Sequence, residues 1–70
     1  MSEKARFPQS SAIRAIRFDR RGLEVTFASG SVYLYRGVSR NVFERFRLAD
    51  SAGKFFNEEI LDRYPFARLR

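Results

Sequence analysis

Arginine dominates the charged residues of this chain and indicates which chemistry its surface can do. Of the 14 basic residues, all but Lys4 and Lys54 are arginine, and the eight acidic residues leave a formal net charge of +6. Guanidinium groups make paired hydrogen bonds to phosphates and stack on nucleobases. Net charge alone indicates only a tendency to associate with polyanions, and it equally serves solubility.

Six of the arginines fall where strands, their first turn and the strand–helix junction are expected: Arg14, Arg17, Arg20, Arg21, Arg36 and Arg40. If helices cover one face of a sheet, these side chains can gather on the open face and attract phosphates. Scattered surface charge, diluted by Asp19 and Glu24, is the alternative interpretation. Lys54 follows Ser51, so a helix N-terminus there could hold an anion, although helix capping by itself accounts for Ser51.

Two tyrosines, Tyr33 and Tyr35, alternate on one strand that ends at Arg36. A sheet that carries aromatic rings beside arginines can stack bases of single-stranded nucleic acid. Packing in the core is the commoner role of such rings. Which role applies depends on the face of the sheet to which the tyrosines point.

Catalysis has little support in the sequence. The chain has no histidine and no cysteine, so the usual bases, nucleophiles, disulfides and zinc sites are absent. Glu58, Glu59 and Asp62 could crowd on a helix, but a solvated acidic face explains them better than a cation site. We therefore expect a protein that is not an enzyme and needs no metal or other cofactor.

Hydrophobic periodicity predicts a small α+β domain. Strands are expected over residues 12–18, 23–27 and 31–36, with a turn at Asp19–Gly22. Ser39 and Ser51 are expected to cap two helices, which end near Ala49 and before Pro65. The predicted fold is thus a three-stranded antiparallel meander followed by two helices packed on one face (β-β-β-α-α). Residues 1–10 are expected to be a flexible arm, and residues 11–70 the domain.

The irregular first strand and the second hairpin leave alternatives. Ile13, Ile16 and Phe18 do not alternate cleanly, which indicates a β-bulge or a mixed facing. A three-residue loop ending at Gly30 pairs Val25 with Tyr33 and turns the tyrosines to the core. A two-residue loop inverts every side chain and exposes them. We favour the three-residue loop.

The order of residues from Ser11 to Tyr64 resembles the KTSC domain family. The resemblance rests on Ser11–Ile13, Ile16–Asp19, Leu23–Phe27, the Tyr33-Leu34-Tyr35 element, Gly37-Val38, Ala49–Gly53, Phe56-Asn57, Ile60 and Tyr64. Phe18 and Ser39 depart from the tyrosine and proline that are frequent in the family. The resemblance implies a module that occurs at the C-terminus of some lysyl-tRNA synthetases and as a small bacterial protein, and this context suggests RNA.

The sequence and the resemblance together predict a cytoplasmic bacterial module that binds nucleic acid through an arginine-rich sheet surface. RNA is the nucleic acid that we favour. The rival hypothesis is a protein-interaction module or homodimer of a bacterial or phage system. In the favoured register Val32 and Leu34 point away from the core, and exposed apolar residues on a sheet suggest a second partner. No apolar run approaches the length of a membrane span, and no membrane partner is expected.

Overall fold

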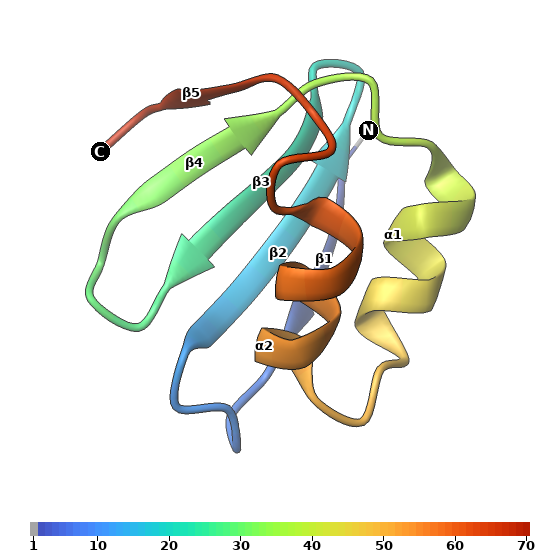
Figure 1. The fold of residues 1–70 in the computed structure, drawn as a ribbon. Helices are drawn as coiled ribbons and strands as arrows, with labels where there is room; N and C mark the ends of the chain where they lie inside the picture. Colours follow the sequence, from blue (N-terminus) through green and yellow to red (C-terminus); the bar gives the residue numbers. More distant parts are fainter. Residues whose placement is uncertain (1) are drawn as a thin grey trace.

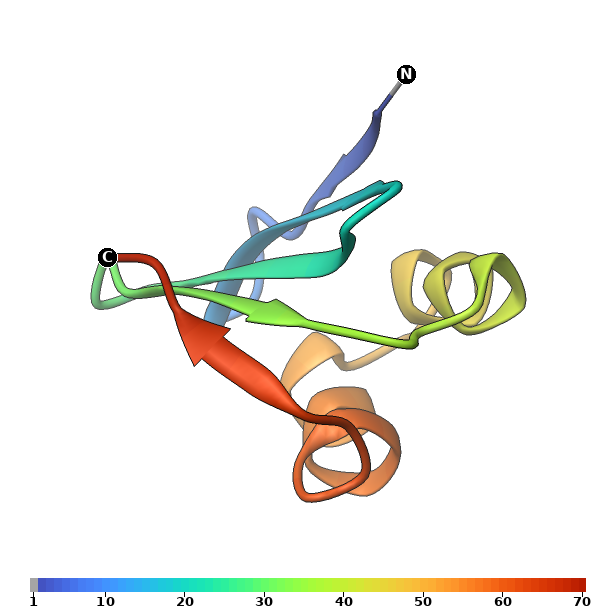
Figure 2. The same cartoon turned by 90° about the horizontal axis from the view of Figure 1, so that it is seen from above.

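Five antiparallel strands form one sheet in the order β1-β2-β3-β4-β5 (Figure 1). The computed structural model describes residues 2–70. The strands are β1 (Glu3–Arg6), β2 (Ile13–Asp19), β3 (Gly22–Phe27), β4 (Val32–Tyr35) and β5 (Phe66–Arg68). The helices lie between β4 and β5 in the chain and pack on one side of the sheet, while its other side is bare (Figure 2). The predicted α+β class and the placement of the helices are confirmed.

Two serines begin the helices as expected. Ser39 caps α1 (Arg40–Arg47) by accepting a hydrogen bond from the Val42 N–H at 3.3 Å. Ser51 does the same for α2 (Ala52–Phe55), at 3.2 Å from the Lys54 N–H. The chain continues from α2 into a π-helical turn, η1 (Phe56–Ile60).

The core fills the space between the helices and the near side of the sheet. Its fully buried side chains come from alternating positions of β2 and β3 and from α1 and η1: Ile13, Ile16, Leu23, Val25, Phe43, Phe46 and Ile60. Rings extend this core, since Phe18 stacks on Phe43 with centroids 5.3 Å apart. The buried face of α1, which carries Phe43 and Phe46, thus holds this helix to the sheet.

The favoured register of the second hairpin is confirmed. Val25 pairs with Tyr33 and Leu23 with Tyr35, so both tyrosines share the helix side of the sheet with the core residues. The loop closes through a 2.9 Å hydrogen bond from the Gly30 N–H to the Phe27 carbonyl, and Gly30 has a φ of 98°. A positive φ favours glycine there.

Strand β2, the first strand predicted from the sequence, contains the bulge that its residues indicated. Ile13 pairs with Phe27 and Ala15 with Thr26, which leaves Arg14 as the extra residue. The bulge restores alternation, so Ile13 and Ile16 both reach the core although three positions separate them.

Residues 1–10 were expected to be a flexible arm, and this prediction is wrong for the part that forms β1. Glu3 and Ala5 pair with Phe18 and Ile16 of β2. Phe7 then stacks on Phe46, with ring centroids 5.6 Å apart. Met1 lies outside the described residues. Burial of Phe7 against α1 holds the segment, a long-range contact that local periodicity does not reveal.

The three-stranded meander is likewise corrected to five strands, because the C-terminal tail also joins the sheet. Phe66 pairs with Tyr35, and Arg68 with Tyr33. The Arg36 N–H donates to the Pro65 carbonyl at 2.9 Å, which starts the pairing. A three-residue strand after a proline offers too few alternating positions to be recognised from its sequence.

Candidate nucleic-acid interface

The helices cover only part of the sheet face on which the tyrosines lie. In Figure 1, β4 and β5 extend clear of both helices on the left of the molecule. Tyr35 is nevertheless buried, since the ring of Phe56 packs against it with centroids 5.6 Å apart. Tyr33, nearer the open end of the strand, is half-buried. The tyrosines therefore face the core side, yet one of them keeps a surface that a ligand can reach.

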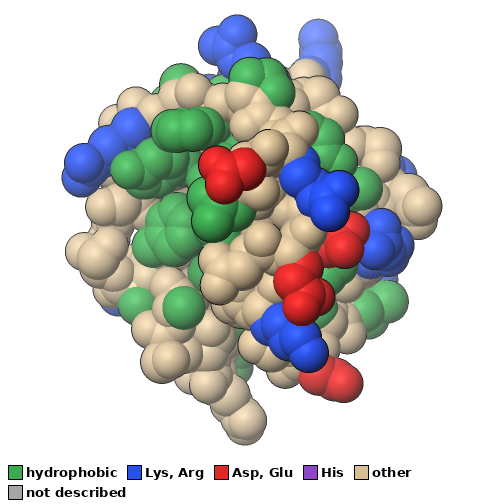
Figure 3. Space-filling model, viewed as in Figure 1, with side chains coloured by type: hydrophobic (Ala, Val, Ile, Leu, Met, Phe, Trp, Pro, Cys, Tyr) green, Lys and Arg blue, Asp and Glu red, His purple; other side chains and the backbone are tan. Residues whose placement is uncertain are grey.

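A hollow opens beside Tyr33, and we call it the aromatic groove. It has a volume of about 620 Å³. Hydrophobic side chains gather over this part of the molecule, between the C-terminal strands and α2 (Figure 3). The apolar side chains that define the groove are Phe27, Tyr33, Tyr35, Phe56, Leu61 and Phe66. Its size and its aromatic lining are typical of ligand-binding hollows.

Phe66 forms the outer wall of the aromatic groove. Its side chain is 59% exposed, whereas the other seven phenylalanines are buried or half-buried. Pairing of β5 with β4 places its ring 5.6 Å from Tyr33 and 5.6 Å from Tyr35, centroid to centroid. Sequence reasoning missed Phe66 because its position depends on a strand that was not predicted.

Arg68 is a basic residue that lies over one of these rings. Its guanidinium carbon lies 5.9 Å from the centroid of the Tyr33 ring, within the range of a cation–π interaction. Arg68 Nη2 donates to Ser31 Oγ at 3.3 Å, and Nε donates to the Arg70 main-chain oxygen at 3.0 Å. These contacts hold a cation at the groove. A role for Arg68 was not predicted from the sequence either, because only the β4–β5 register brings Arg68 to Tyr33.

Burial raises the pKa of the Tyr35 phenol, and the neighbouring Tyr33 and Asp62 add to the effect. Tyr35 is therefore neutral at physiological pH, and its ring serves as packing at the floor of the groove. Asp62 follows Leu61, so it brings negative charge to the helical side of the groove. The opposite side carries Arg68.

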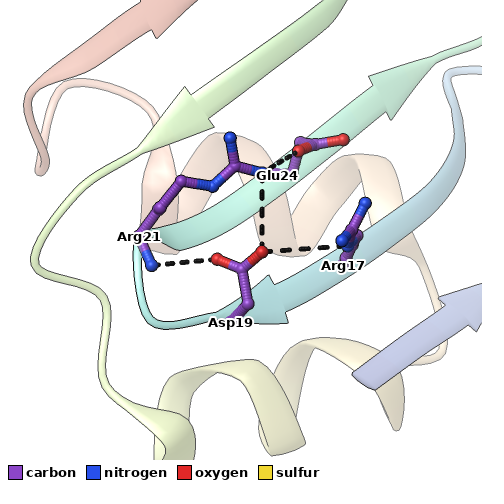
Figure 4. A network of polar contacts seen from close by, with 4 residues as sticks. All are labelled: Arg17, Asp19, Arg21 and Glu24. Atoms are coloured by element: carbon purple, nitrogen blue, oxygen red, sulfur yellow. Dashed lines mark hydrogen bonds and ion pairs between the residues drawn. The ribbon is translucent and has the colours of Figure 1, made fainter. Parts of the chain in front are cut away.

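Two of the predicted phosphate-binding arginines lie instead in a network on the bare side of the sheet (Figure 4). Arg21 Nη2 lies 3.5 Å from Asp19 Oδ2 and 3.2 Å from Glu24 Oε2. Arg17 Nε is 3.8 Å from Asp19 Oδ2, beyond hydrogen-bond reach. Two carboxylates thus neutralise two guanidinium groups. Asp19 and Glu24 therefore dilute the positive charge of this surface, which was the alternative interpretation of the sequence.

The Arg21 main-chain N–H, 2.9 Å from Asp19 Oδ1, lowers the pKa of the Asp19 carboxyl, and the side chain of Arg21 and the charge of Arg17 contribute further. The carboxyl stays charged at neutral pH and shapes the turn between β2 and β3.

Arg40 is also engaged by acidic groups. It forms an ion pair with Glu3 of β1, and its Nη2 lies 3.8 Å from Glu44 Oε2. The pair with Glu3 ties the first strand to α1. Arg40 is therefore less available to phosphates than the sequence suggested.

The remaining predicted cations, Arg14, Arg20, Arg36 and Lys54, are exposed. None of them forms an ion pair within residues 2–70. Arg14 Nη2 donates to the carbonyl of Ala28, a residue of the groove wall, at 2.9 Å. The predicted residues do not form one surface; Arg14 reaches the wall of the aromatic groove, Arg36 follows Tyr35 of its lining, and their nucleic-acid role stays a prediction.

Neither a metal site nor a membrane segment is found in the described part of the chain. Residues 2–70 bring no three acidic, histidine or cysteine side chains together in a geometry that could hold a metal ion. None of their helices has the length and apolarity required to cross a bilayer.

This architecture, an antiparallel sheet half covered by two helices inserted before the last strand, defines a class of small α+β domains. The profile of the KTSC domain family matches residues 9–64. The chain belongs to the KTSC domain family. The crystal structure of a KTSC domain protein from Yersinia pestis superposes with a TM-score of 0.89 at 26% identity, covering 100% of both chains.

A sequence relative agrees with this assignment. An uncharacterized protein of Stutzerimonas stutzeri (strain A1501) is 40% identical over 52 residues, which cover 71% of this chain and 73% of the relative.

Proposed function

We propose that this protein is a non-catalytic nucleic-acid-binding module whose partner is RNA. The observation that carries the proposal is the distribution of ion pairs. Five arginines pair with five carboxylates among residues 2–70. The net charge of +6 therefore rests on cations without an acidic partner. These nine cations are Lys4, Arg6, Arg14, Arg20, Arg36, Lys54, Arg63, Arg68 and Arg70, and the three carboxylates that form no ion pair within residues 2–70, Asp50, Glu58 and Asp62, reduce their charge to +6.

Three of these cations contact or adjoin residues that line the aromatic groove, and we call them the basic rim: Arg14, Arg36 and Arg68. Arg14 binds the Ala28 carbonyl, and Arg68 lies over Tyr33. Arg36 follows Tyr35, and its main chain bonds to the residue before Phe66. An unpaired guanidinium at a groove can contact a phosphate without first breaking an ion pair, so the basic rim is the best-placed phosphate-binding set.

The rival hypothesis, a protein-binding or dimerising sheet face, loses the observation that motivated it. Val32 and Leu34 do point away from the helix-side core, as the register predicted. Both are only 4% exposed, however. The bare side of the sheet thus offers no apolar surface at these residues for a second partner.

The test exchanges charge at the basic rim while a matched variant exchanges charge elsewhere. Replacing Arg14, Arg36 and Arg68 by glutamine should weaken binding to labelled RNA in fluorescence anisotropy and lower the slope of log K against log salt by about two, since each single-strand phosphate contact contributes about 0.7. The control replaces the ion-paired arginines of α1, Arg40, Arg45 and Arg47, by glutamine, with the same change in net charge. If both variants lose the same affinity and slope, binding reflects net charge alone and the proposed surface is wrong.

A further inference from the structure

We infer that the aromatic groove is a stacking site for an unpaired nucleobase, so that the partner of this module is a single strand and not a duplex. This inference rests on the proposed function and deepens it. The bare side of the sheet was the expected binding surface, but the groove lies on the helix side, where β4 and β5 extend past the helices.

Exposure of the Phe66 ring is the first step of the argument. Burying a phenylalanine side chain is favourable, and the chain buries or half-buries every other phenylalanine. Phe66 nevertheless leaves 59% of its surface in water, directly beside the half-buried Tyr33. Two rings with reachable surface, held 5.6 Å apart on paired strands, present aromatic area on which a flat base can stack.

The floor of the groove is rigid, which favours such a contact. Phe27 meets Tyr33 edge-on, with an interplanar angle of 87° and a centroid distance of 5.7 Å. Phe56 meets Phe27 in the same way at 5.2 Å. Rings locked by their neighbours lose little conformational entropy when a ligand binds.

The charges around the groove indicate which kind of aromatic ligand it fits. The β5 side carries Arg68, whose guanidinium is fixed near Tyr33 by Ser31 and has no acidic partner within residues 2–70. The helical side carries Asp62, next to Leu61. A nucleotide satisfies this asymmetry when its base enters the groove and its phosphate lies along β5, away from the carboxylate. A base inside a duplex has both faces covered by its neighbours and cannot stack here, so the groove selects single strands.

A substitution of Phe66 separates this site from general attraction to polyanions. Phe66→Ala should bind single-stranded RNA about 5- to 150-fold more weakly, the range measured for loss of one base stack, with its salt slope unchanged. The control is Leu48→Ala, which truncates a 69% exposed side chain at the C-cap of α1 and should leave binding unchanged. Circular dichroism checks that both variants fold.

A second variant reports the contact directly. The chain has no tryptophan, so Phe66→Trp provides a single indole in the groove, which can be excited selectively at wavelengths that tyrosine does not absorb. Its emission should be quenched by single-stranded RNA and unaffected by an equal concentration of duplex RNA, since stacking on a base quenches indole emission only on contact.

The outcomes separate this inference from the proposed function. If Phe66→Ala binds RNA as tightly as the wild type, or if duplex RNA quenches Phe66→Trp as strongly as single-stranded RNA does, the stacking site is wrong. The proposed nucleic-acid-binding function would still stand. Failure of the wild type to bind any RNA or DNA at low salt overturns both. Self-association that Phe66→Ala abolishes, in a protein that binds no RNA, would assign the groove to a second copy of the chain.

Discussion

Gly22, at the residue scale, occupies the closest approach between β3 and the end of β4. Its φ is 133°, and a Cβ built there would lie 2.3 Å from the carbonyl oxygen of Tyr35. Gly22→Ala should therefore lower the free energy of unfolding by about 2 kcal/mol or more, from backbone strain and the clash together. Urea denaturation followed by circular dichroism measures this.

Gly30→Ala is the matched control for that substitution. Gly30 also has a positive φ, 98°, but a Cβ there meets nothing within 4 Å. Strain alone should cost about 1 kcal/mol. Equal losses for the two variants would show that the contact with Tyr35 does not matter.

Asp19 gives the protein a pH dependence of known sign. Its carboxyl has a lowered pKa in the folded state because the Arg21 N–H donates to it. The charged form therefore stabilises the fold above the unfolded pKa of about 3.9, and this contribution is lost as the pH falls through the lower folded value.

Asp19→Asn should accordingly be less stable than the wild type at pH 7. Urea unfolding from pH 7 to pH 2 should show the difference shrinking as the wild-type carboxyl protonates. A difference that stayed constant with pH would mean that the charge of Asp19 contributes nothing.

The element scale shows what local patterns reveal and what they miss. Ser39, Ser51 and Gly30 indicated the two helix starts and the hairpin loop, because capping and a positive φ are decided within a few residues. The edge strands β1 and β5 were missed because four and three residues carry too little alternation. Their stability comes from pairing with distant strands, which no local window contains.

Phe7 tests whether the N-terminal segment belongs to the fold. Its ring is half-buried and stacks on Phe46 of α1. Phe7→Ala should lower the free energy of unfolding by about 2 kcal/mol, somewhat less than the cost for a fully buried ring. The exposed neighbour Gln9, changed to alanine, should have an effect within about 0.5 kcal/mol. A flexible arm would make both substitutions neutral in chemical denaturation.

Local sequence patterns also revealed only part of the candidate site. Tyr33, Arg14 and Arg36 could be selected from residue type and from their places near predicted strands. Phe66 and Arg68 could not, since they reach Tyr33 only through a strand added after the helices. Half of the candidate site was therefore within reach of the sequence, and the half that makes it a groove depends on tertiary pairing.

At the scale of the whole molecule, charge and coverage act together. Within residues 2–70, ion pairs cancel equal numbers of arginines and carboxylates, and the cations without acidic partners outnumber the unpaired carboxylates, which gives the net charge of +6. The two helices cover the sheet over β1–β3 and leave the aromatic rings beside β5 accessible to a ligand (Figures 1 and 3). The proposed attraction to polyanions and the proposed aromatic contact thus lie on one molecule, and we expect the second to give the first its selectivity.

The measurement that tests this account most directly is a fluorescence-anisotropy titration of the wild-type protein with labelled single-stranded RNA, duplex RNA and DNA, at low salt and at about 0.15 M salt. The account predicts micromolar or tighter binding to single-stranded RNA that persists at the higher salt, with weaker binding to duplexes. Binding to every polyanion that disappears at 0.15 M salt, or equal affinity for single strand and duplex, would contradict it.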